Sequence, residues 1–168
     1  SKSFADRGHL CCVGIDPRAE DLINCQFFGG SFDESLGQFC DLIISSTEDE
    51  VDIFKFNLAF FLAMGPDGMG LLSSLTRKLK ANNKIVILDA KFGDISSTVE
   101  AYAEAFLTEK HYSFDSVTIS PLSGEEGMKL CADYIEKNDK GLFVWFSSSD
   151  NNDSMVNEEK IIWESNLE

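Results

Sequence analysis

The chain has 168 residues, enough for one ordinary domain with a sizeable core. Its 29 acidic and 14 basic residues give a formal net charge of −15, which excludes a general nucleic-acid binder because such a protein needs a basic face. Apolar stretches are shorter than the ~20 residues that span a bilayer, and the polar start lacks the apolar core of a signal peptide. The five cysteines include no Cys-x-x-Cys pair and favour neither a disulfide framework nor a zinc site. We therefore expect a globular cytoplasmic protein with neither nucleic acid nor membrane as partner.

Five short strand-like runs follow one another, and longer amphipathic or polar stretches separate them. Strands are expected at residues 11–16, 53–58, 84–91, 116–120 and 141–146. Helices are expected at residues 32–46, 68–80, 98–110 and 124–136, with Thr98 as the N-cap of the third. This spacing is typical of a repeated strand–helix unit of ~30 residues.

The alternation of strands and helices predicts an α/β fold with a parallel sheet. No Gly-x-Gly-x-x-Gly follows the first strand, so a dinucleotide-binding sheet has no support. Charged residues instead stand at the ends of several strands, where a (β/α)8 TIM barrel builds its active site. We predict such a barrel, with about five of its eight strand–helix units in this chain. Because eight units need at least ~200 residues, we expect residues 1–168 to form a single barrel domain that is incomplete at its C-terminus.

Four charged residues are expected at one mouth of this barrel. Side chains two residues apart on a strand share a face, so Asp89 and Lys91 point the same way. In a closed barrel that face also carries Lys55 and Asp16 from earlier strands, and Asp94 lies in the following loop. Alternating lysines and aspartates offset the cost of charges on an apolar face, because each has an opposite neighbour. From spacing alone, ordinary surface salt bridges at a strand end are an equally open alternative.

Five motifs, one at each predicted strand, extend over nearly the whole chain. They are Cys11–Arg18 (CCVGIDPR), Phe54–Phe61 (FKFNLAFF), Ile87–Thr98 (ILDAKFGDISST), Ser116–Pro121 (SVTISP) and Gly141–Val144 (GLFV). In this order they resemble the orotidine 5'-phosphate decarboxylase family. The resemblance implies a lyase of pyrimidine biosynthesis that decarboxylates orotidine 5'-monophosphate to uridine 5'-monophosphate, the last step of de novo UMP synthesis. It also implies that no metal and no cofactor is used.

The same resemblance implies four catalytic residues. Lys91 would be the proton donor and the fixed positive charge beside the carbanion that forms at pyrimidine C6. Asp89 would orient Lys91 and press against the departing carboxylate. Lys55 would hold Asp89 and reach the ribose, and Asp94 would complete the alternating array.

The resemblance further implies a nucleotide-binding site and a homodimer. The substrate-binding residues would be Asp16, Asn57, Ile95, Thr98 and Ser149. Of these, Asp16 would accept a hydrogen bond from a ribose hydroxyl, and Ser149 would contact the pyrimidine; alternatively, Ser149 is an ordinary loop serine. Together with Asp94, two of them, Ile95 and Thr98, would cross the dimer interface into the partner's site.

Several residues depart from the family pattern. Phe92 stands where the family has an arginine, and residues 147–151 (SSSDN) replace the usual Lys/Arg-Thr-Ser-Asn-Pro. The phosphate-binding arginine and the mobile loop of the family have no counterpart in residues 1–168. A non-catalytic barrel relative that serves as a binding or assembly partner is therefore an alternative. A metal-dependent barrel lyase that uses the same Asp-x-Lys-x-x-Asp cluster on another sugar phosphate is a third reading.

Overall fold

The computed structural model describes residues 11–18 and 32–146 of the chain. Within these ranges, five parallel strands form one sheet in which the spatial order of the strands is their order in the sequence. The strands are β1 (Cys12–Ile15), β2 (Ile53–Asn57), β3 (Ile85–Phe92), β4 (Ser116–Ile119) and β5 (Gly141–Val144). All five predicted strands are therefore confirmed, each within two residues at either end.

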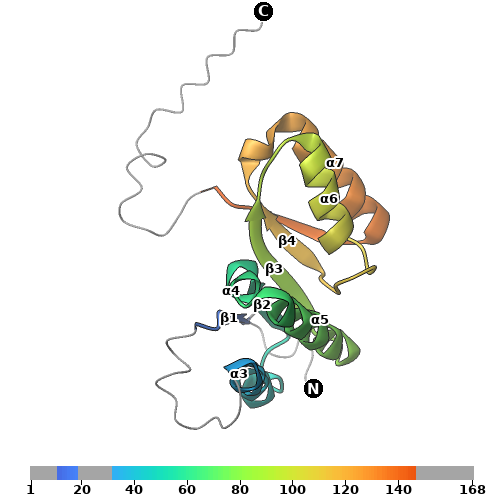
Figure 1. Cartoon of the computed structure of the whole chain (residues 1–168). Helices are drawn as coiled ribbons and strands as arrows, with labels where there is room; N and C mark the ends of the chain where they lie inside the picture. The colour runs from blue at the N-terminus through green and yellow to red at the C-terminus, as the bar shows by residue number, and fades with distance from the viewer. Residues whose placement is uncertain (1–10, 19–31, 147–168) are drawn as a thin grey trace, which may run out of the picture.

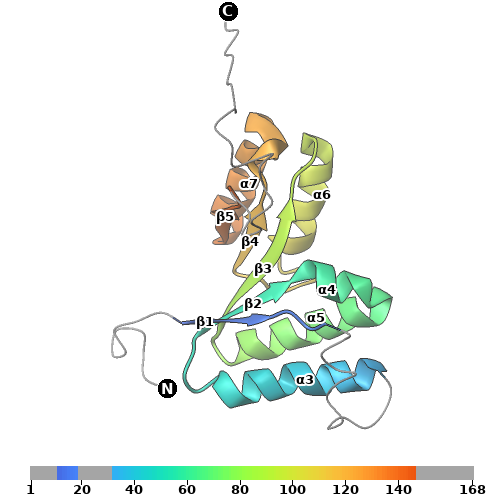
Figure 2. The ribbon, with the colours of Figure 1, turned by 90° about the vertical axis from the view of Figure 1, so that its left-hand side faces the viewer.

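Four longer helices connect the strands and lie along one side of the curved sheet (Figures 1 and 2). They are α3 (Phe32–Thr47), α5 (Gly65–Ala81), α6 (Ser96–Phe106) and α7 (Gly124–Asn138). All four were predicted. Two short helices, α4 (Leu58–Ala63) and η1 (Pro121–Ser123), directly follow β2 and β4. They escaped prediction because a few residues are too short a window for helical periodicity.

The start of α6 corrects one prediction. Thr98 was expected to be the N-cap, but Ile95 holds that position with an extended backbone. The amide of Thr98 already donates to the Ile95 carbonyl oxygen at 3.0 Å, so Thr98 lies inside the first turn. The side chain of Ile95 makes no capping bond, and the helix therefore begins without the polar signal on which the prediction relied.

The two faces of the sheet differ in exposure. Phe54, Phe56, Val86 and Leu88 point toward the helices and are 0% exposed. On the opposite face, Ile85 is 45% exposed. A parallel sheet with helices on only one side is the wall of a β/α barrel, because a doubly wound sheet is covered on both faces. The uncovered face is thus the one that lines a barrel interior.

Phe92, the residue that replaces an arginine of the family, belongs to the core. Its ring is 5% exposed and stacks on Tyr102 of α6, with centroids 4.8 Å apart. Tyr102 in turn stacks on Phe106 at 6.3 Å. The substitution therefore exchanges a cation for an aromatic contact that joins the end of β3 to α6.

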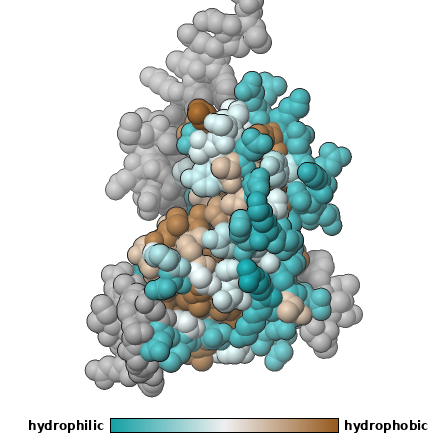
Figure 3. Space-filling view, turned by 45° about the vertical axis from the view of Figure 1, so that its right-hand side comes forward, coloured by the Kyte–Doolittle hydropathy of each residue, from teal (hydrophilic) through white to brown (hydrophobic). Residues whose placement is uncertain are grey.

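One face of the molecule combines hydrophilic and apolar residues. Figure 3 shows hydrophilic residues over much of one face, with apolar residues gathered near its middle. Strongly exposed apolar side chains include Leu122 at 89% and Ile95 at 70%. None of the described helices has both the length and the apolar content of a membrane span.

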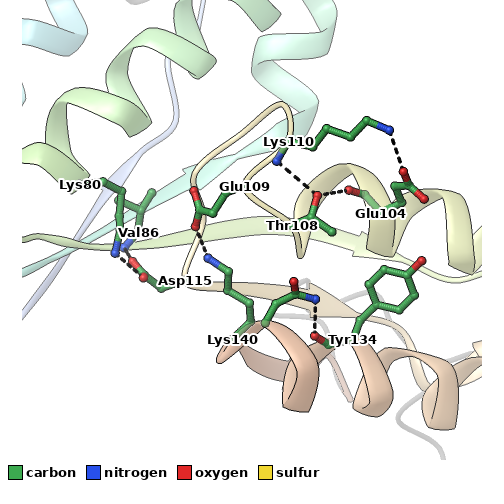
Figure 4. A network of polar contacts seen from close by, with 10 residues as sticks. Lys80, Val86, Glu104, Thr108, Glu109, Lys110, Asp115, Tyr134 and Lys140 are labelled. Carbon is green, nitrogen blue, oxygen red and sulfur yellow. Dashed lines mark hydrogen bonds and ion pairs between the residues drawn. The ribbon is translucent and has the colours of Figure 1, made fainter.

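Ion pairs join the elements at the amino ends of the strands (Figure 4). The Asp115 carboxylate contacts Lys80 Nζ of α5 at 2.5 Å and accepts a hydrogen bond from the Val86 amide of β3 at 2.7 Å. A second ion pair connects Lys140 to Glu109. These contacts stabilise the end of the sheet opposite to the predicted site, which in a barrel is the end devoted to stability.

The contact between α4 and α5 depends on a glycine and yields a first prediction. A Cβ added at Gly68 would lie 2.2 Å from the Phe61 carbonyl oxygen, whereas one added at Gly70 of the same helix would meet open space. We expect Gly68→Ala to lower the free energy of unfolding by about 1–3 kcal/mol, because the two helices must separate. Gly70→Ala is the matched control and should raise it by about 0.5–1 kcal/mol through helix propensity. Urea unfolding measures both; equal effects of the two substitutions would contradict the close approach.

Candidate active site

The carboxylate of Asp89 is the centre of a polar cluster near the carboxyl end of β3. Its side chain is 10% exposed. Oδ2 lies 3.0 Å from Lys55 Nζ on β2, and Oδ1 lies 2.5 Å from Lys91 Nζ. Oδ1 also accepts a hydrogen bond from the Thr118 hydroxyl of β4 at 3.0 Å. Three neighbouring strands thus each supply a donor to one carboxylate.

These donors keep Asp89 ionised. Burial raises the pKa of the carboxyl group, but hydrogen bonds from Lys91, Lys55 and Thr118 outweigh that effect and hold the pKa below its ordinary value. One carboxylate faces two ammonium groups, so the cluster carries a net positive charge in a chain whose formal charge is −15. Both lysine side chains remain about one-third exposed, which leaves them open to a ligand.

The register of the sheet explains why these residues meet. Asn57 pairs with Asp89 across β2 and β3, and Gly14 pairs with Lys55 across β1 and β2. Lys55 precedes Asn57 by two residues, so both side chains lie on the same face of the sheet. The long Lys55 side chain therefore reaches Asp89 from two residues nearer the amino end of the strands. Parallel pairing brings the carboxyl ends of the strands to the same edge.

A bulge in β3 sets the position of Lys91. Leu88 pairs with Val117 and Phe92 pairs with Ile119, so four residues of β3 span the distance of two in β4. Within the bulge Lys91 has φ of 49°, a left-handed conformation that is uncommon for residues other than glycine. Strand alternation correctly predicted that Asp89 and Lys91 meet, although the Lys91 backbone is not in an extended conformation.

Asp16 and Asn57 lie on the same side of the sheet as the cluster. Asp16 is exposed, and its Oδ2 is 3.9 Å from the position that a Cβ of Gly14 would occupy. Asn57 Oδ1 accepts a hydrogen bond from the Ala59 amide at 3.2 Å and thereby caps α4. Asn57 therefore has a structural function that the sequence had not indicated.

Three further predicted site residues that the structure describes, Asp94, Ile95 and Thr98, make no hydrogen bond or ion pair with this cluster within the chain. Asp94 is exposed, and its Oδ1 accepts a hydrogen bond from the Ile95 amide at 2.7 Å. Ile95 and Thr98 belong to the start of α6, as described above. Ser149 lies outside the described residues. The structure thus brings together Lys55, Asp89 and Lys91, while roles for the others remain predictions.

Thr118 is a member of the cluster that the sequence reasoning missed. Its hydroxyl donates to Asp89 and accepts a hydrogen bond from the Lys91 amide at 2.8 Å. The available signal was the alternation Ser116, Thr118, Ser120, which places hydroxyl groups on one face of β4. Within the two described ranges, no three His, Cys, Asp or Glu side chains gather in a way that could hold a metal ion.

A parallel sheet with helices on one face and lysines interleaved with an aspartate at its carboxyl edge defines a β/α-barrel protein with a candidate active site. Comparison with known proteins makes the assignment specific. Residues 10–165 match the model of the orotidine 5'-phosphate decarboxylase / HUMPS family, and the chain belongs to that family.

Individual relatives agree with this assignment. An orotidine 5'-phosphate decarboxylase of Streptomyces coelicolor is 36% identical over 146 residues, which are 85% of this chain and 51% of the relative. One of Salinispora arenicola is 37% identical over 145 residues, with the same coverage. The crystal structure of a Streptomyces avermitilis protein matches with a TM-score of 0.77 and 34% identity, over 88% of this chain and 51% of that one. The chain therefore spans about half the length of these relatives.

The lowered pKa of Asp89 gives a prediction about acid stability. A carboxylate whose pKa is lower in the folded state stabilises that state above its unfolded pKa, and the stabilisation is lost as pH falls through the folded pKa. We expect Asp89→Asn to lower the free energy of unfolding most above about pH 5, and the difference from wild type to shrink below about pH 4. Urea titrations at several pH values measure it. A difference that stays constant across this range would exclude the assigned ion pairs.

Proposed function

We propose that the protein decarboxylates orotidine 5'-monophosphate to uridine 5'-monophosphate. The observation that carries the proposal is the contact of Asp89 with Lys55 and Lys91 at the carboxyl edge of the sheet. Membership of the family supports it, and so do the names of the two bacterial relatives. We propose this activity for the whole protein, in which Lys55, Asp89 and Lys91 form the candidate catalytic cluster.

The chemistry requires positive charge at the carbon that loses carbon dioxide. Departure of carbon dioxide leaves an electron pair at C6 of the pyrimidine, and a fixed ammonium group stabilises that charge as it develops. Lys91 Nζ has this role in the proposal and then donates its proton to C6, which completes uridine 5'-monophosphate. Because Asp89 already holds Lys91 in place, little reorganisation is needed when the carbanion forms.

The remaining residues of the cluster bind and orient the nucleotide. Lys55 keeps Asp89 ionised and extends toward the ribose, while Asp16 accepts a hydrogen bond from a ribose hydroxyl. Asn57 lies between these groups and contributes its amide nitrogen, since its oxygen caps α4. Ser149 contacts the pyrimidine. Neither a metal ion nor an organic cofactor has a role in this mechanism.

We also propose that the protein is a homodimer and that Asp94, Ile95 and Thr98 reach the partner's site. Within one chain Asp94 contacts the Ile95 amide rather than Lys91. The Ile95 side chain is 70% exposed, which is a large apolar area to leave in water. An interface at the start of α6 would bury Ile95 and bring Asp94 beside the lysine cluster of the other subunit.

The proposed compartment is the cytoplasm, and residues 1–168 are proposed to belong to a single barrel domain. Cys11, Cys12, Cys40 and Cys131 of the described part are free thiols, as expected where the environment is reducing. Burial raises the pKa of Cys40 to about 12, so this thiol is unreactive. The continuous sheet β1–β5 with one core supports the single domain.

Substitution of Lys91 tests the proposed activity. In the protein that carries residues 1–168, we expect Lys91→Ala to reduce turnover of orotidine 5'-monophosphate by more than about 10²–10³-fold, because charge and proton are both lost. The measurement is the loss of pyrimidine absorbance, made with and without a chelator. Lys78→Ala is the matched control, since this lysine of α5 pairs with Asp41 of α3 and both side chains are about half exposed. Near-normal turnover by Lys91→Ala would refute the assignment.

Substitution of Ile95 tests the dimer. We expect Ile95→Glu to convert a dimer into a monomer, because a buried charge at the interface costs several kcal/mol. Leu42→Glu is the control: Leu42 is 55% exposed on α3, away from the proposed interface. Sedimentation velocity of the three proteins gives the oligomeric state. A variant Ile95→Glu that remains dimeric would place the interface elsewhere.

A further inference from the structure

Thr118 makes two hydrogen bonds, one to the Asp89 carboxylate and one to the backbone of Lys91. Its hydroxyl donates to Asp89 Oδ1 at 3.0 Å. The same oxygen accepts a hydrogen bond from the backbone amide of Lys91 at 2.8 Å. A hydroxyl has one proton, so once its oxygen accepts from the amide, the proton is directed toward Asp89.

These bonds close a ring through Lys91. The ring runs from the Lys91 amide to Thr118 Oγ1, then to Asp89 Oδ1, and returns through Lys91 Nζ, which lies 2.5 Å from Oδ1. Lys55 holds the second carboxylate oxygen at 3.0 Å. Both ends of Lys91 are therefore tied to the carboxylate that orients it, one through the side chain and one through the backbone.

The bulge in β3 explains why this support is needed. Within the bulge Lys91 has no register partner on β4, so its amide lacks the ladder bond that a regular strand would provide. Lys91 also has φ of 49°, which a residue with a side chain adopts only when its surroundings hold it there. The Thr118 hydroxyl takes the place of the missing ladder bond, and regular bonding resumes where the Ser120 amide donates to the Phe92 carbonyl oxygen at 2.8 Å.

We propose that Thr118 is a positioning residue that fixes the backbone of Lys91 and the rotation of the Asp89 carboxylate. Its importance for catalysis rests on the proposed decarboxylation, in which Lys91 must meet C6 at a defined place. The groups that face Asp89 are Lys55 from β2, Lys91 from β3 and Thr118 from β4. Of these, Thr118 is the uncharged one, so its removal changes geometry and hydrogen bonding without removing a charge.

Two variants at this position separate the hydroxyl from the volume of the side chain. Thr118→Val keeps the shape and the strand preference but has no hydroxyl, and Thr118→Ser keeps the hydroxyl in a smaller side chain. Ser120→Ala is the matched control just beyond the end of β4, because Ser120 Oγ accepts a hydrogen bond from the Leu122 amide and caps η1. Thermal unfolding followed by circular dichroism establishes that each variant is folded.

The test uses nuclear magnetic resonance of the chain without substrate, so it is independent of whether the protein is a decarboxylase. The first readout is the pH titration of the Asp89 carboxyl carbon, assigned with Asp89→Asn. The second is hydrogen exchange of the Lys91 amide. We expect Thr118→Val to raise the pKa of Asp89 toward its ordinary value and to accelerate exchange at Lys91 about three- to tenfold, as loss of one hydrogen bond implies. Thr118→Ser and Ser120→Ala should resemble wild type in both.

Two results would overturn the proposal. One is a Thr118→Val protein whose Asp89 titration and Lys91 exchange match wild type. The other is a Lys91 amide that exchanges as fast as an unprotected amide in the wild-type protein. This second measurement uses the wild-type protein alone, so it does not depend on whether a variant folds. If the proposal holds and the whole protein turns over substrate, Thr118→Val should lower kcat more than it changes KM. Inactivity of the wild-type protein toward orotidine 5'-monophosphate would refute the proposed function and leave the structural assignment of Thr118 intact.

Discussion

The Asp89 carboxylate is the interaction on which the carboxyl edge of the sheet depends. A carboxylate 10% exposed would be unfavourable without partners, and two neighbouring lysines would repel one another without an anion between them. The carboxylate and the two ammonium groups stabilise one another, because donors from β2, β3 and β4 converge on the two carboxylate oxygens. The contact also connects three strands through their side chains, so the same interaction that creates the site fixes the relative position of the strands that carry it.

The elements that could be predicted are those with a repeating pattern over several residues. The strand expected at residues 84–91, which the structure has at Ile85–Phe92, and the longer helices could be predicted because burial on one side imposes a period on the sequence. The meeting of Lys55, Asp89 and Lys91 followed from alternation on strands together with parallel pairing. These features depend on regular backbone geometry, and regular geometry is what a single sequence reveals best.

The features that escaped prediction depend on departures from regularity. The bulge that gives Lys91 a φ of 49° has no glycine or other local signal, and the role of Thr118 exists only because of that bulge. The N-cap of α6 is Ile95, which makes no side-chain capping bond, so the prediction of Thr98 as the N-cap is wrong. Asn57 was expected in ligand binding, and its oxygen also caps α4. Such positions are set by packing between elements that lie far apart in the sequence.

The order of the strands has a consequence for how the protein acquires its site during folding. Each strand pairs with the strands that precede and follow it in the sequence, so contacts form between consecutive strand–helix units and loop-closure costs stay low. The charged cluster lies entirely between Lys55 and Thr118, within the units of β2, β3 and β4. It can therefore assemble during synthesis as soon as β4 has left the ribosome, before β5 has docked, and the order of translation becomes an order of assembly.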